Sequence, residues 1–269
     1  MATGNISGTR GRSARFRKAA ERRIFAYQVL LIVAIFALWE FAIQQQWIKA
    51  YLYGQPSGIW REFVKAVNDG SLLNHTWVTA YESILGFLIG GVLGSAAGLA
   101  MWLSPTLARV LRPVMVALNG VPKIALAPLI IVWFGVGFES KVAIAAIICF
   151  IVAIITAYAG TQEIDDDLIR LMRSLGASRW QIFQKVVVPG CVPWLISGFR
   201  LNVGFALIGA VVGEYISAEV GLGFLVYYSG TLYNLGAVWL GILTLMVLAL
   251  VMDYAVGLVE RRLRWRFSE

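Results

Sequence analysis

Residues 163–189 read EIDDDLIRLMRSLGASRWQIFQKVVVP, a polar segment inside a chain that otherwise consists largely of long apolar runs. Apolar residues recur in it at three- and four-residue spacing, which predicts a helix with one apolar face made of Leu168, Leu171, Met172 and Leu175. Acids open this helix and bases close it, as the helix dipole prefers. Gly176 is placed to end the helix in a left-handed conformation. Ser178 and Gln181 form a capping box that begins a second short helix, and Pro189 is expected to end it.

The composition places the chain in a membrane. Of its 269 residues, 59% are hydrophobic and 14% are charged, whereas soluble globular domains are roughly 45–50% apolar. The net charge of +8 could attract nucleic acid, but seven of the 23 Lys and Arg residues lie within 10–23 and four lie within 261–266. Bases that flank apolar spans mark the cytoplasmic ends of those spans. We therefore expect an integral membrane protein that is surrounded by lipid and has no nucleic acid partner.

Six apolar runs are long enough to span a membrane as helices. They cover residues 24–43, 78–103, 110–134, 142–158, 192–212 and 237–259. Six spans put both termini on one side, where 17 Lys and Arg residues then lie against four on the other side. The positive-inside rule places both termini and residues 163–189 in the cytoplasm. The predicted parts are a basic cytoplasmic tail (1–23), one six-helix transmembrane domain (24–260) and a basic cytoplasmic C-terminal tail (261–269).

Two segments are expected on the opposite, outer side. Residues 44–74 contain an amphipathic run, which predicts a short helix at the outer interface: Ile59, Phe63, Val64 and Val67. Residues 214–234 mix glycines with aromatic residues, and could dip partly into the membrane or cap the outer mouth.

Two patterns inside the spans predict close helix packing and a helix break. Small residues repeat every four positions along the second span, which allows close contact within the subunit or against a second copy: Gly86, Gly90, Gly94 and Gly98. Pro122 and Pro128 lie six residues apart in the third span, where each removes a backbone donor. We therefore expect the third span to be kinked or broken beside neighbouring helices or a watery path.

Five polar residues in or near the spans are candidates for lining a translocation path: Asn119, Lys123, Arg200, Asn202 and Glu214. A charge inside a span is costly unless it finds a partner or water. Lys123 could line the path, form an internal salt bridge or extend toward the interface. Arg200 could attract an anionic solute, because guanidinium pairs well with oxyanions, or could bridge to Asp253 or Glu214 and set the helix register. Glu214 lies near a span end, which argues against a proton-relay carboxylate and so against proton-coupled transport.

The chain carries no motif for nucleotide binding or catalysis. No glycine is followed by lysine, so a GxxxxGK(S/T) phosphate-binding loop is absent. His75 is the sole histidine, and neither HExxH nor Cys-x-x-Cys spacing occurs. Cys149 and Cys191 fall in or beside apolar runs, where thiols behave as small hydrophobic groups. We expect neither an enzyme nor a metal site, and ATP with magnesium, if it drives this protein, must be bound by another chain.

Several short motifs are spread from the third span to the fifth, namely PKIALAPL at 122–129, WFG at 133–135, RSLGAS at 173–178 and VPG at 188–190. Together they resemble the nitrate, sulfonate, taurine and bicarbonate branch of ABC importer permeases, over roughly residues 70–266. Gly176 and the VVVP at 186–189 also match in spacing the cytoplasmic coupling segment of these permeases. The Glu-Ala-Ala motif of that segment is replaced here by Arg170-Leu171-Met172.

The resemblance implies the all-α type I importer fold with cytoplasmic coupling helices, in a bacterial inner membrane. It also implies a second permease subunit, usually identical, together with two ATPase subunits, an external solute-binding protein and transport by alternating access. The contact with the ATPase is then expected at Asp165, Asp166, Arg170, Met172, Leu175, Gly176, Ala177, Trp180 and Phe183. The apolar members of this set could instead pack beneath the subunit's own spans.

The cargo follows less directly from the sequence. The branch and the interior cations favour a small anion such as a sulfonate, taurine, nitrate or bicarbonate, and the alternative cargo is a neutral or aromatic vitamin precursor. The alternative class of function is an ATP-independent secondary transporter or channel. Transport that survives loss of ATP and follows an ion gradient would indicate that class.

Overall fold

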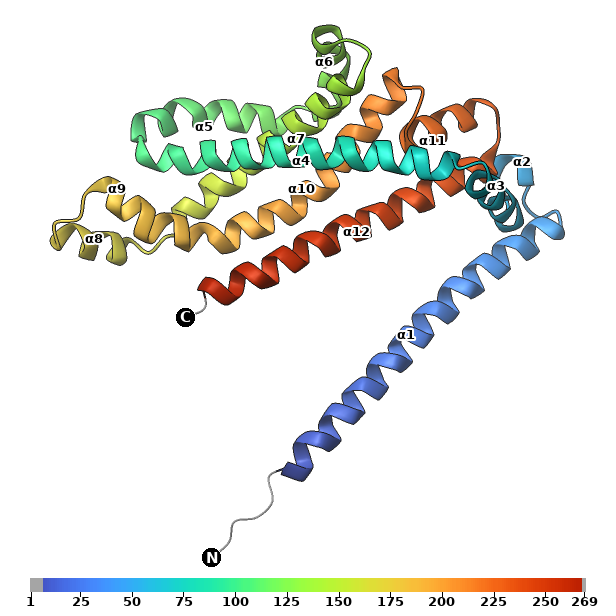
Figure 1. The fold of residues 1–269 in the computed structure, drawn as a ribbon, viewed down its shortest axis with the longest axis horizontal. Coiled ribbons are helices and arrows are strands. Elements are labelled where there is room, and N and C mark those ends of the chain that lie inside the picture. Colours follow the sequence, from blue (N-terminus) through green and yellow to red (C-terminus); the bar gives the residue numbers. More distant parts are fainter. Residues whose placement is uncertain (1–6, 268–269) are drawn as a thin grey trace, which may run out of the picture.

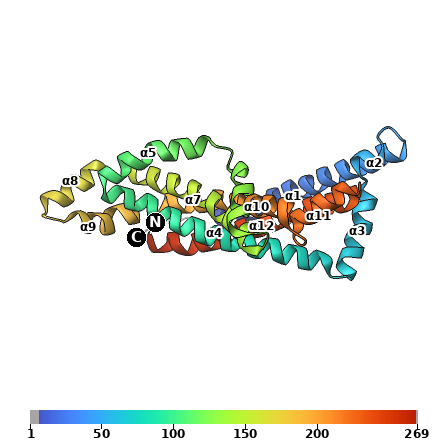
Figure 2. The same cartoon turned by 90° about the horizontal axis from the view of Figure 1, so that it is seen from above.

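The computed structural model of the chain describes the backbone of residues 7–267 and the side chains of residues 23–262 except 25 and 259. All regular secondary structure in this range is helical. The elements are α1 (Ser7–Gln44), α2 (Ala50–Tyr53), α3 (Pro56–Asn68), α4 (Ser71–Leu103), α5 (Pro105–Gly120), η1 (Lys123–Leu126), α6 (Ala127–Phe134), α7 (Phe138–Gln162), α8 (Asp166–Ser174), α9 (Arg179–Ile182), η2 (Phe183–Val187), α10 (Val188–Ser217), α11 (Leu222–Thr231) and α12 (Leu235–Phe267). The body is elongated: α4, α7, α10 and α12 run along its length, α8 and α9 lie at one end, and α3 and α11 lie at the other (Figures 1 and 2).

Five helices are long and apolar enough to cross a membrane, namely Ala26–Gln44, Ser71–Leu103, Phe138–Gln162, Arg179–Ser217 and Leu235–Arg262. The sixth candidate span is α5 together with η1 and α6, and it is bent by 96° at a short break. Pro122 precedes η1, and Pro128 lies in the first turn of α6. The prediction of an all-α membrane protein is confirmed, with five candidate spans, or six if the bent pair counts as one span. The break predicted near Pro122 is also confirmed.

The centre of the bundle is the contact between α4 and α7, against which α10 packs. The four glycines of the predicted repeat, Gly86, Gly90, Gly94 and Gly98, face α7, and a Cβ at Gly94 would lie 2.5 Å from the carbonyl oxygen of Phe150. A Cβ at Gly98 would lie 2.5 Å from the carbonyl oxygen of Ile154. The glycine repeat thus brings two backbones together inside this subunit, as close packing of membrane helices requires.

The fifth span differs from its prediction. Pro189 does not end the second short helix: α9 continues through the π-helical turn η2 into α10, so that one helix runs from Arg179 to Ser217. In this turn the Val188 N–H donates to the carbonyl of Phe183, five residues back. Such a π turn shifts the hydrogen-bond register, and Pro189, which has no N–H, follows within the first turn of α10. The proline is therefore accommodated inside the helix.

The first and last helices continue beyond the predicted spans into the predicted tails. Helix α1 begins at Ser7, so it continues through residues 23 and 24, and α12 continues through residues 260 and 261. Residues 1–6 and 268–269 of the predicted tails lie outside the described residues. Helix α1 diverges from the other long helices (Figure 1), and within its apolar stretch, Ala26–Gln44, only Ile43 is buried. The predicted amphipathic helix of residues 44–74 is α3, which packs on α12.

Candidate functional site

The polar segment of residues 163–189 folds as a capped helical hairpin, called here the α8–α9 hairpin. Asp165 caps α8 by accepting the N–H of Asp167 at 2.8 Å. At the other end Gly176 has φ +79, and its N–H donates to the carbonyl of Arg173 at 3.0 Å. The N–H of Ala177 donates to the carbonyl of Met172 at 3.0 Å. These two bonds make a Schellman motif, so the predicted role of Gly176 is confirmed.

The second helix of the hairpin begins with the predicted capping box. The Gln181 N–H donates to the Ser178 hydroxyl at 3.3 Å, and the Ser178 N–H donates to the Gln181 side-chain oxygen at 2.8 Å. Both ends of the turn between α8 and α9 are therefore fixed by local hydrogen bonds. The hairpin is a defined surface element and not an irregular loop.

One face of the hairpin packs inward. Ile169 on α8, Ile182 on α9, Val187 and Cys191 form a buried cluster, and the partly buried residues around it include Met172, Ala177 and Phe183. The guanidinium of Arg179 donates to the carbonyl of Trp102 at 2.7 Å and lies over the Trp102 ring. The hairpin is thereby tied to the end of α4. Three of the predicted contact residues, Met172, Ala177 and Phe183, thus pack at least partly against their own subunit.

The opposite face of the hairpin is apolar and exposed. Leu168 is 50% exposed, Leu171 is 54% exposed and Leu175 is 73% exposed, and Trp180 of α9 is 54% exposed. The predicted apolar face of α8 is therefore divided, because Met172 turns inward while the three leucines point away. Ile169, which was not part of the predicted face, is the residue of α8 that is buried. Exposed apolar groups gathered on one protruding element are typical of an interaction surface.

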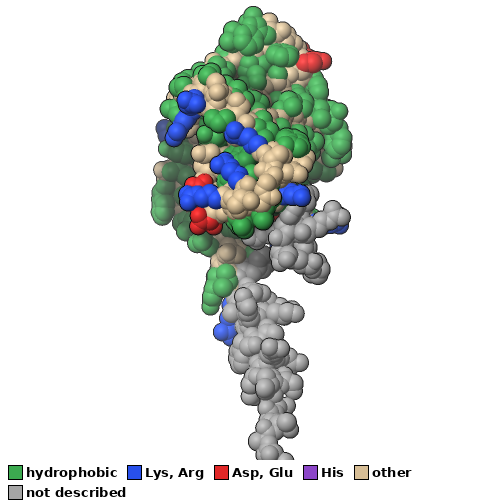
Figure 3. Space-filling view, turned by 90° about the vertical axis from the view of Figure 1, so that its left-hand side faces the viewer, with side chains coloured by type: hydrophobic (Ala, Val, Ile, Leu, Met, Phe, Trp, Pro, Cys, Tyr) green, Lys and Arg blue, Asp and Glu red, His purple; other side chains and the backbone are tan. Residues whose placement is uncertain are grey.

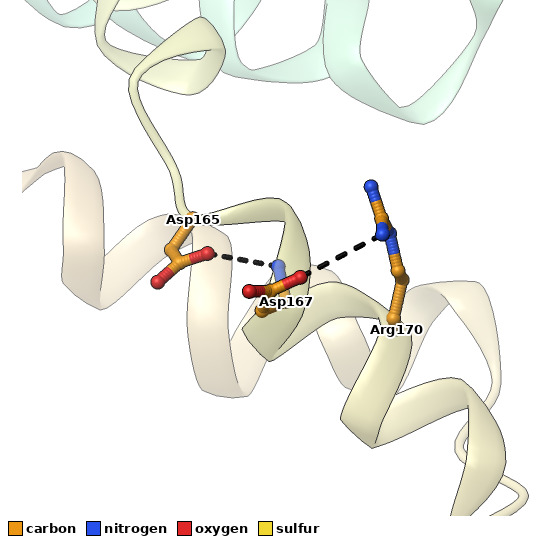
Figure 4. A network of polar contacts seen from close by, with 3 residues as sticks. All are labelled: Asp165, Asp167 and Arg170. Atoms are coloured by element: carbon orange, nitrogen blue, oxygen red, sulfur yellow. Dashed lines mark hydrogen bonds and ion pairs between the residues drawn. The ribbon is translucent and has the colours of Figure 1, made fainter.

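Charged groups surround these leucines. Arg170 forms an ion pair with Asp167 at 3.7 Å, one turn along α8 (Figure 4). Both side chains are more than 70% exposed, so this pair contributes little to stability. Figure 3 looks onto this end of the molecule and shows several separate Lys and Arg side chains, and fewer acidic ones, among hydrophobic groups. Asp165, Asp166 and Arg170 therefore remain available to a partner.

The predicted path residues do not form one cluster. Asn119 is exposed near the end of α5, and Lys123 is half-buried at the break between α5 and α6. The Lys123 side chain makes no hydrogen bond or ion pair with any described residue. A cation that has no partner among the described residues and lies at a helix break fits a position beside water or solute.

Arg200 has a different partner from the two that were predicted. Its guanidinium lies 3.0 Å from the carboxylate of Glu260 on α12, so the predicted bridge to Asp253 or Glu214 is wrong. Arg200 lies close to Gly257, which leaves the side chain room to extend along α12 toward Glu260. The bridge joins α10 to α12. The role of Arg200 toward an anionic solute stays a prediction.

Asn202 of α10 is fully buried where this helix packs on α4 and α7. Neither its side-chain oxygen nor its side-chain nitrogen has a hydrogen-bond partner among the described residues. A Cβ at Gly91 of α4 would lie 4.0 Å from the Asn202 side-chain nitrogen, and the Cys149 thiol of α7 lies 3.5 Å from the Asn202 carbonyl oxygen. The side chain thus lies inside the subunit in this conformation. A buried amide without partners destabilises the fold.

Glu214 is a buried structural link and not an exposed path residue in this conformation. It is 1% exposed, and its carboxylate accepts the hydroxyl of Thr79 at 2.6 Å and the N–H of Gly223 at 2.6 Å. Gly221, at φ +127, has no room for a Cβ because the Glu214 carboxylate lies against it. Glu214 therefore joins α10 to α4 and to the start of α11.

The family of the chain follows from comparison with known proteins. Residues 86–265 match the family described as the binding-protein-dependent transport system inner membrane component. The chain belongs to this family.

The permease resembles proteins from several transport systems. It is 32% identical over 240 residues to the riboflavin transport system permease protein RibX of Chloroflexus aurantiacus, covering 89% of each chain. It is 29% identical over 268 residues to the putative aliphatic sulfonates transport permease protein SsuC of Bacillus subtilis, covering 99% of this chain and 97% of that one. It is 32% identical over 195 residues to the taurine transport system permease protein TauC of Escherichia coli K12, covering 72% and 71%.

The fold also matches a solved transporter. A chain of the inward-facing methionine ABC transporter MetNI superposes with a TM-score of 0.65 at 20% identity, covering 71% of this permease and 95% of that chain. The resemblance to ABC importer permeases of the sulfonate and taurine branch is confirmed, as is the type I fold. The chain is a transmembrane permease subunit of a binding-protein-dependent ABC importer, an inner membrane component that works with an ATPase and a binding protein. The ATP-independent alternative is not favoured.

Sequence reasoning about the permease missed His75 and Thr79 as structural partners of Gly221 and Leu222. The sequence does indicate that the two residues act together, because they lie four positions apart and so share a helix face near the start of α4. Their partners lie more than 140 positions later in the chain. No local pattern identifies such partners.

Proposed function

We propose that ATPase subunits dock on the α8–α9 hairpin of this permease and drive alternating access from there. In this arrangement the hairpin and both chain termini are cytoplasmic, and α11 is at the outer side. The basic parts at 1–23 and 261–269 are the cytoplasmic tails, and ATP and magnesium are bound by the ATPase. The transmembrane domain comprises residues 24–260.

The observation that carries this proposal is the exposed leucine face on a turn that is capped at both ends. Fully burying a leucine side chain contributes about 1.5–3 kcal/mol. Leu175 is 73% exposed, so covering it would contribute roughly 1–2 kcal/mol to docking. Arg170, Asp165 and Asp166 border this face and would supply orientation more than affinity.

The continuity of α9, η2 and α10 supports the coupling role. One helix of 39 residues runs from the hairpin to Ser217, a length of about 58 Å at 1.5 Å per residue. A push on α9 is therefore transmitted along a single rod through the bundle. Helix α10 packs on α4 and α7, so its displacement acts directly on the neighbouring spans.

The rest of the assembly is our inference from the family. We infer a second permease subunit, identical to this one, two ATPase subunits and an external solute-binding protein. The cargo is proposed to be a small anion of the sulfonate or taurine kind, supported by the names of two relatives and by Lys123 at the break between α5 and α6, which forms no ion pair with a described residue. A neutral aromatic cargo is the second candidate, because the relative RibX is named for riboflavin transport.

The docking surface is tested with a matched pair of substitutions. Leu175→Asp places a charge on the leucine face, and Leu232→Asp does the same at a residue that is 60% exposed near the α11 end. A loss of about 2 kcal/mol corresponds to roughly 30-fold weaker binding. We expect co-purification of the ATPase with membrane-extracted permease to fail for Leu175→Asp and to persist for Leu232→Asp. Equal recovery of the ATPase with wild type and Leu175→Asp would refute docking at this face.

A further inference from the structure

The first turn of α11 is capped by side chains from two other helices. The N–H of Gly221 donates to Nδ1 of His75 at 2.9 Å, and the N–H of Leu222 donates to the hydroxyl oxygen of Thr79 at 2.7 Å. The N–H of Gly223 donates to Oε2 of Glu214 at 2.6 Å. The first N–H groups of a helix have no partner within the helix. Three consecutive groups at the start of α11 are thus satisfied by α4 and α10.

The three acceptors are not equivalent. A threonine hydroxyl accepts at any pH, and a carboxyl group keeps an acceptor oxygen when it is protonated. An imidazole accepts at Nδ1 only while it is neutral, because both nitrogens of the imidazolium are donors. A backbone N–H can only donate, so the bond to Gly221 requires neutral His75. Histidine is the side chain whose charge changes most readily between pH 5 and 8.

Four charged or titratable side chains lie near His75 and the α11 cap: Asp69, Glu82, Lys141 and Glu214. The carboxylate of Asp69 lies before α4, and hydrogen bonds from Ser71 lower the pKa of that carboxyl, so it remains charged in mild acid. Glu214 faces the same cap from α10, with Glu82 on α4 beside it. Lys141 of α7 donates to the carbonyl of Ser217 next to this group. On α11 itself the Phe224 ring faces the imidazole at 6.2 Å.

We propose that His75 is a positioning residue that holds α11 against α4 only while its imidazole is neutral, so that acid at the α11 end loosens this helix and slows the transport cycle. When the imidazole gains a proton, the N–H of Gly221 faces a donor in place of an acceptor. The remaining links to α11 at this turn are those of Thr79 and Glu214. The effect on transport, though not the loosening itself, rests on the proposed function.

Two substitutions separate this role from a general structural one. In His75→Asn the amide oxygen takes the place of Nδ1 as an acceptor and does not titrate, so the cap is retained at every pH. In His75→Ala the acceptor is lost at every pH. Loss of one hydrogen bond corresponds to about a 2- to 10-fold increase in local opening.

The measurement is amide hydrogen exchange in peptides that contain residues 221–223, corrected for the intrinsic pH dependence of exchange, on permease and ATPase together in lipid nanodiscs. ATP hydrolysis is recorded on the same samples. From pH 7.5 to 5.5 we expect exchange in wild type to rise by about 2- to 10-fold and hydrolysis to fall. His75→Asn should show neither change relative to its own value at pH 7.5, and His75→Ala should be open throughout.

Results other than these would overturn specific parts of the proposal. A pH response in His75→Asn equal to that of wild type, or no rise of exchange in wild type, would overturn the role of His75. Exchange that follows the expected pattern while hydrolysis does not would overturn the link to transport and leave the cap established. Absence of ATPase from all preparations would count against the proposed docking function, and the exchange measurement on the permease alone would still decide the role of His75.

Discussion

Replacing Gly94 by alanine is expected to destabilise the bundle, because α4 and α7 meet there without space for a methyl group. The added Cβ would lie 2.5 Å from the carbonyl oxygen of Phe150, 2.8 Å from the Cβ of Ala153 and 3.0 Å from the Cα of Phe150. Carbon contacts are optimal at about 3.5–4.0 Å, so the helices must separate by roughly 1 Å. The obstructing atoms are mostly backbone, which cannot turn aside.

Overpacking of this kind costs about 1–3 kcal/mol, and we expect the upper part of that range because separation at Gly94 also loosens the contacts at Gly90 and Gly98. The gain in helix propensity from glycine to alanine offsets about 1 kcal/mol. A net loss of about 1–2 kcal/mol in the free energy of unfolding should remain.

The control for this substitution is Gly204→Ala on α10, where a Cβ would meet nothing within 4 Å. This variant should be as stable as wild type or slightly more stable, since only the propensity gain applies. The assay is unfolding of the purified permease by titration of SDS into mild detergent, followed by circular dichroism. An unfolding curve for Gly94→Ala that matches wild type, or an equal loss in Gly204→Ala, would refute the account of the contact between α4 and α7.

Two further predictions concern polar residues of the spans. Asn202→Leu should raise the free energy of unfolding by about 1–3 kcal/mol, because it removes a buried amide that has no described partner. A variant that is less stable than wild type in the same SDS titration would show that the amide has hydrogen-bond partners in the folded protein. Lys123→Met should lower uptake of a sulfonate into proteoliposomes about tenfold or more, since a unit charge 4 Å from an anion contributes about 1–4 kcal/mol. The control Lys65→Met on α3 should leave uptake unchanged. Unchanged uptake in Lys123→Met would remove Lys123 from the path.

The local features of the hairpin could be predicted from the sequence because their causes are local. The Schellman turn at Gly176 and the box of Ser178 and Gln181 involve hydrogen bonds between residues three to five positions apart. The break near Pro122 likewise follows from the proline itself. Pro189 was misjudged because the outcome depended on a π turn that precedes it, which no residue type specifies.

The division of the apolar residues of α8 could not be read from spacing. The helix has apolar residues on more than one side, and the choice between them is made by Ile182, Val187 and Cys191, which bury Ile169. The leucines that remain outside are therefore identified only by the packing. Likewise, the partner of Arg200 was unpredictable because Glu260 is 60 positions away on another helix.

The buried cap of α11 shows how the two ends of the permease are connected. Glu214 lies in the last turns of the helix that begins at the hairpin, so Gly223 is bound to the moving rod in the proposed cycle. Gly221 and Leu222 are bound to α4, which the glycine contacts fix to α7. Any sliding of α10 against α4 must therefore break the bond between Thr79 and Glu214 or release α11 from one of the two helices. At about 0.5–1.5 kcal/mol for each hydrogen bond, the cap resists such sliding by a few kcal/mol at most, which favours one arrangement of the α11 end without locking it.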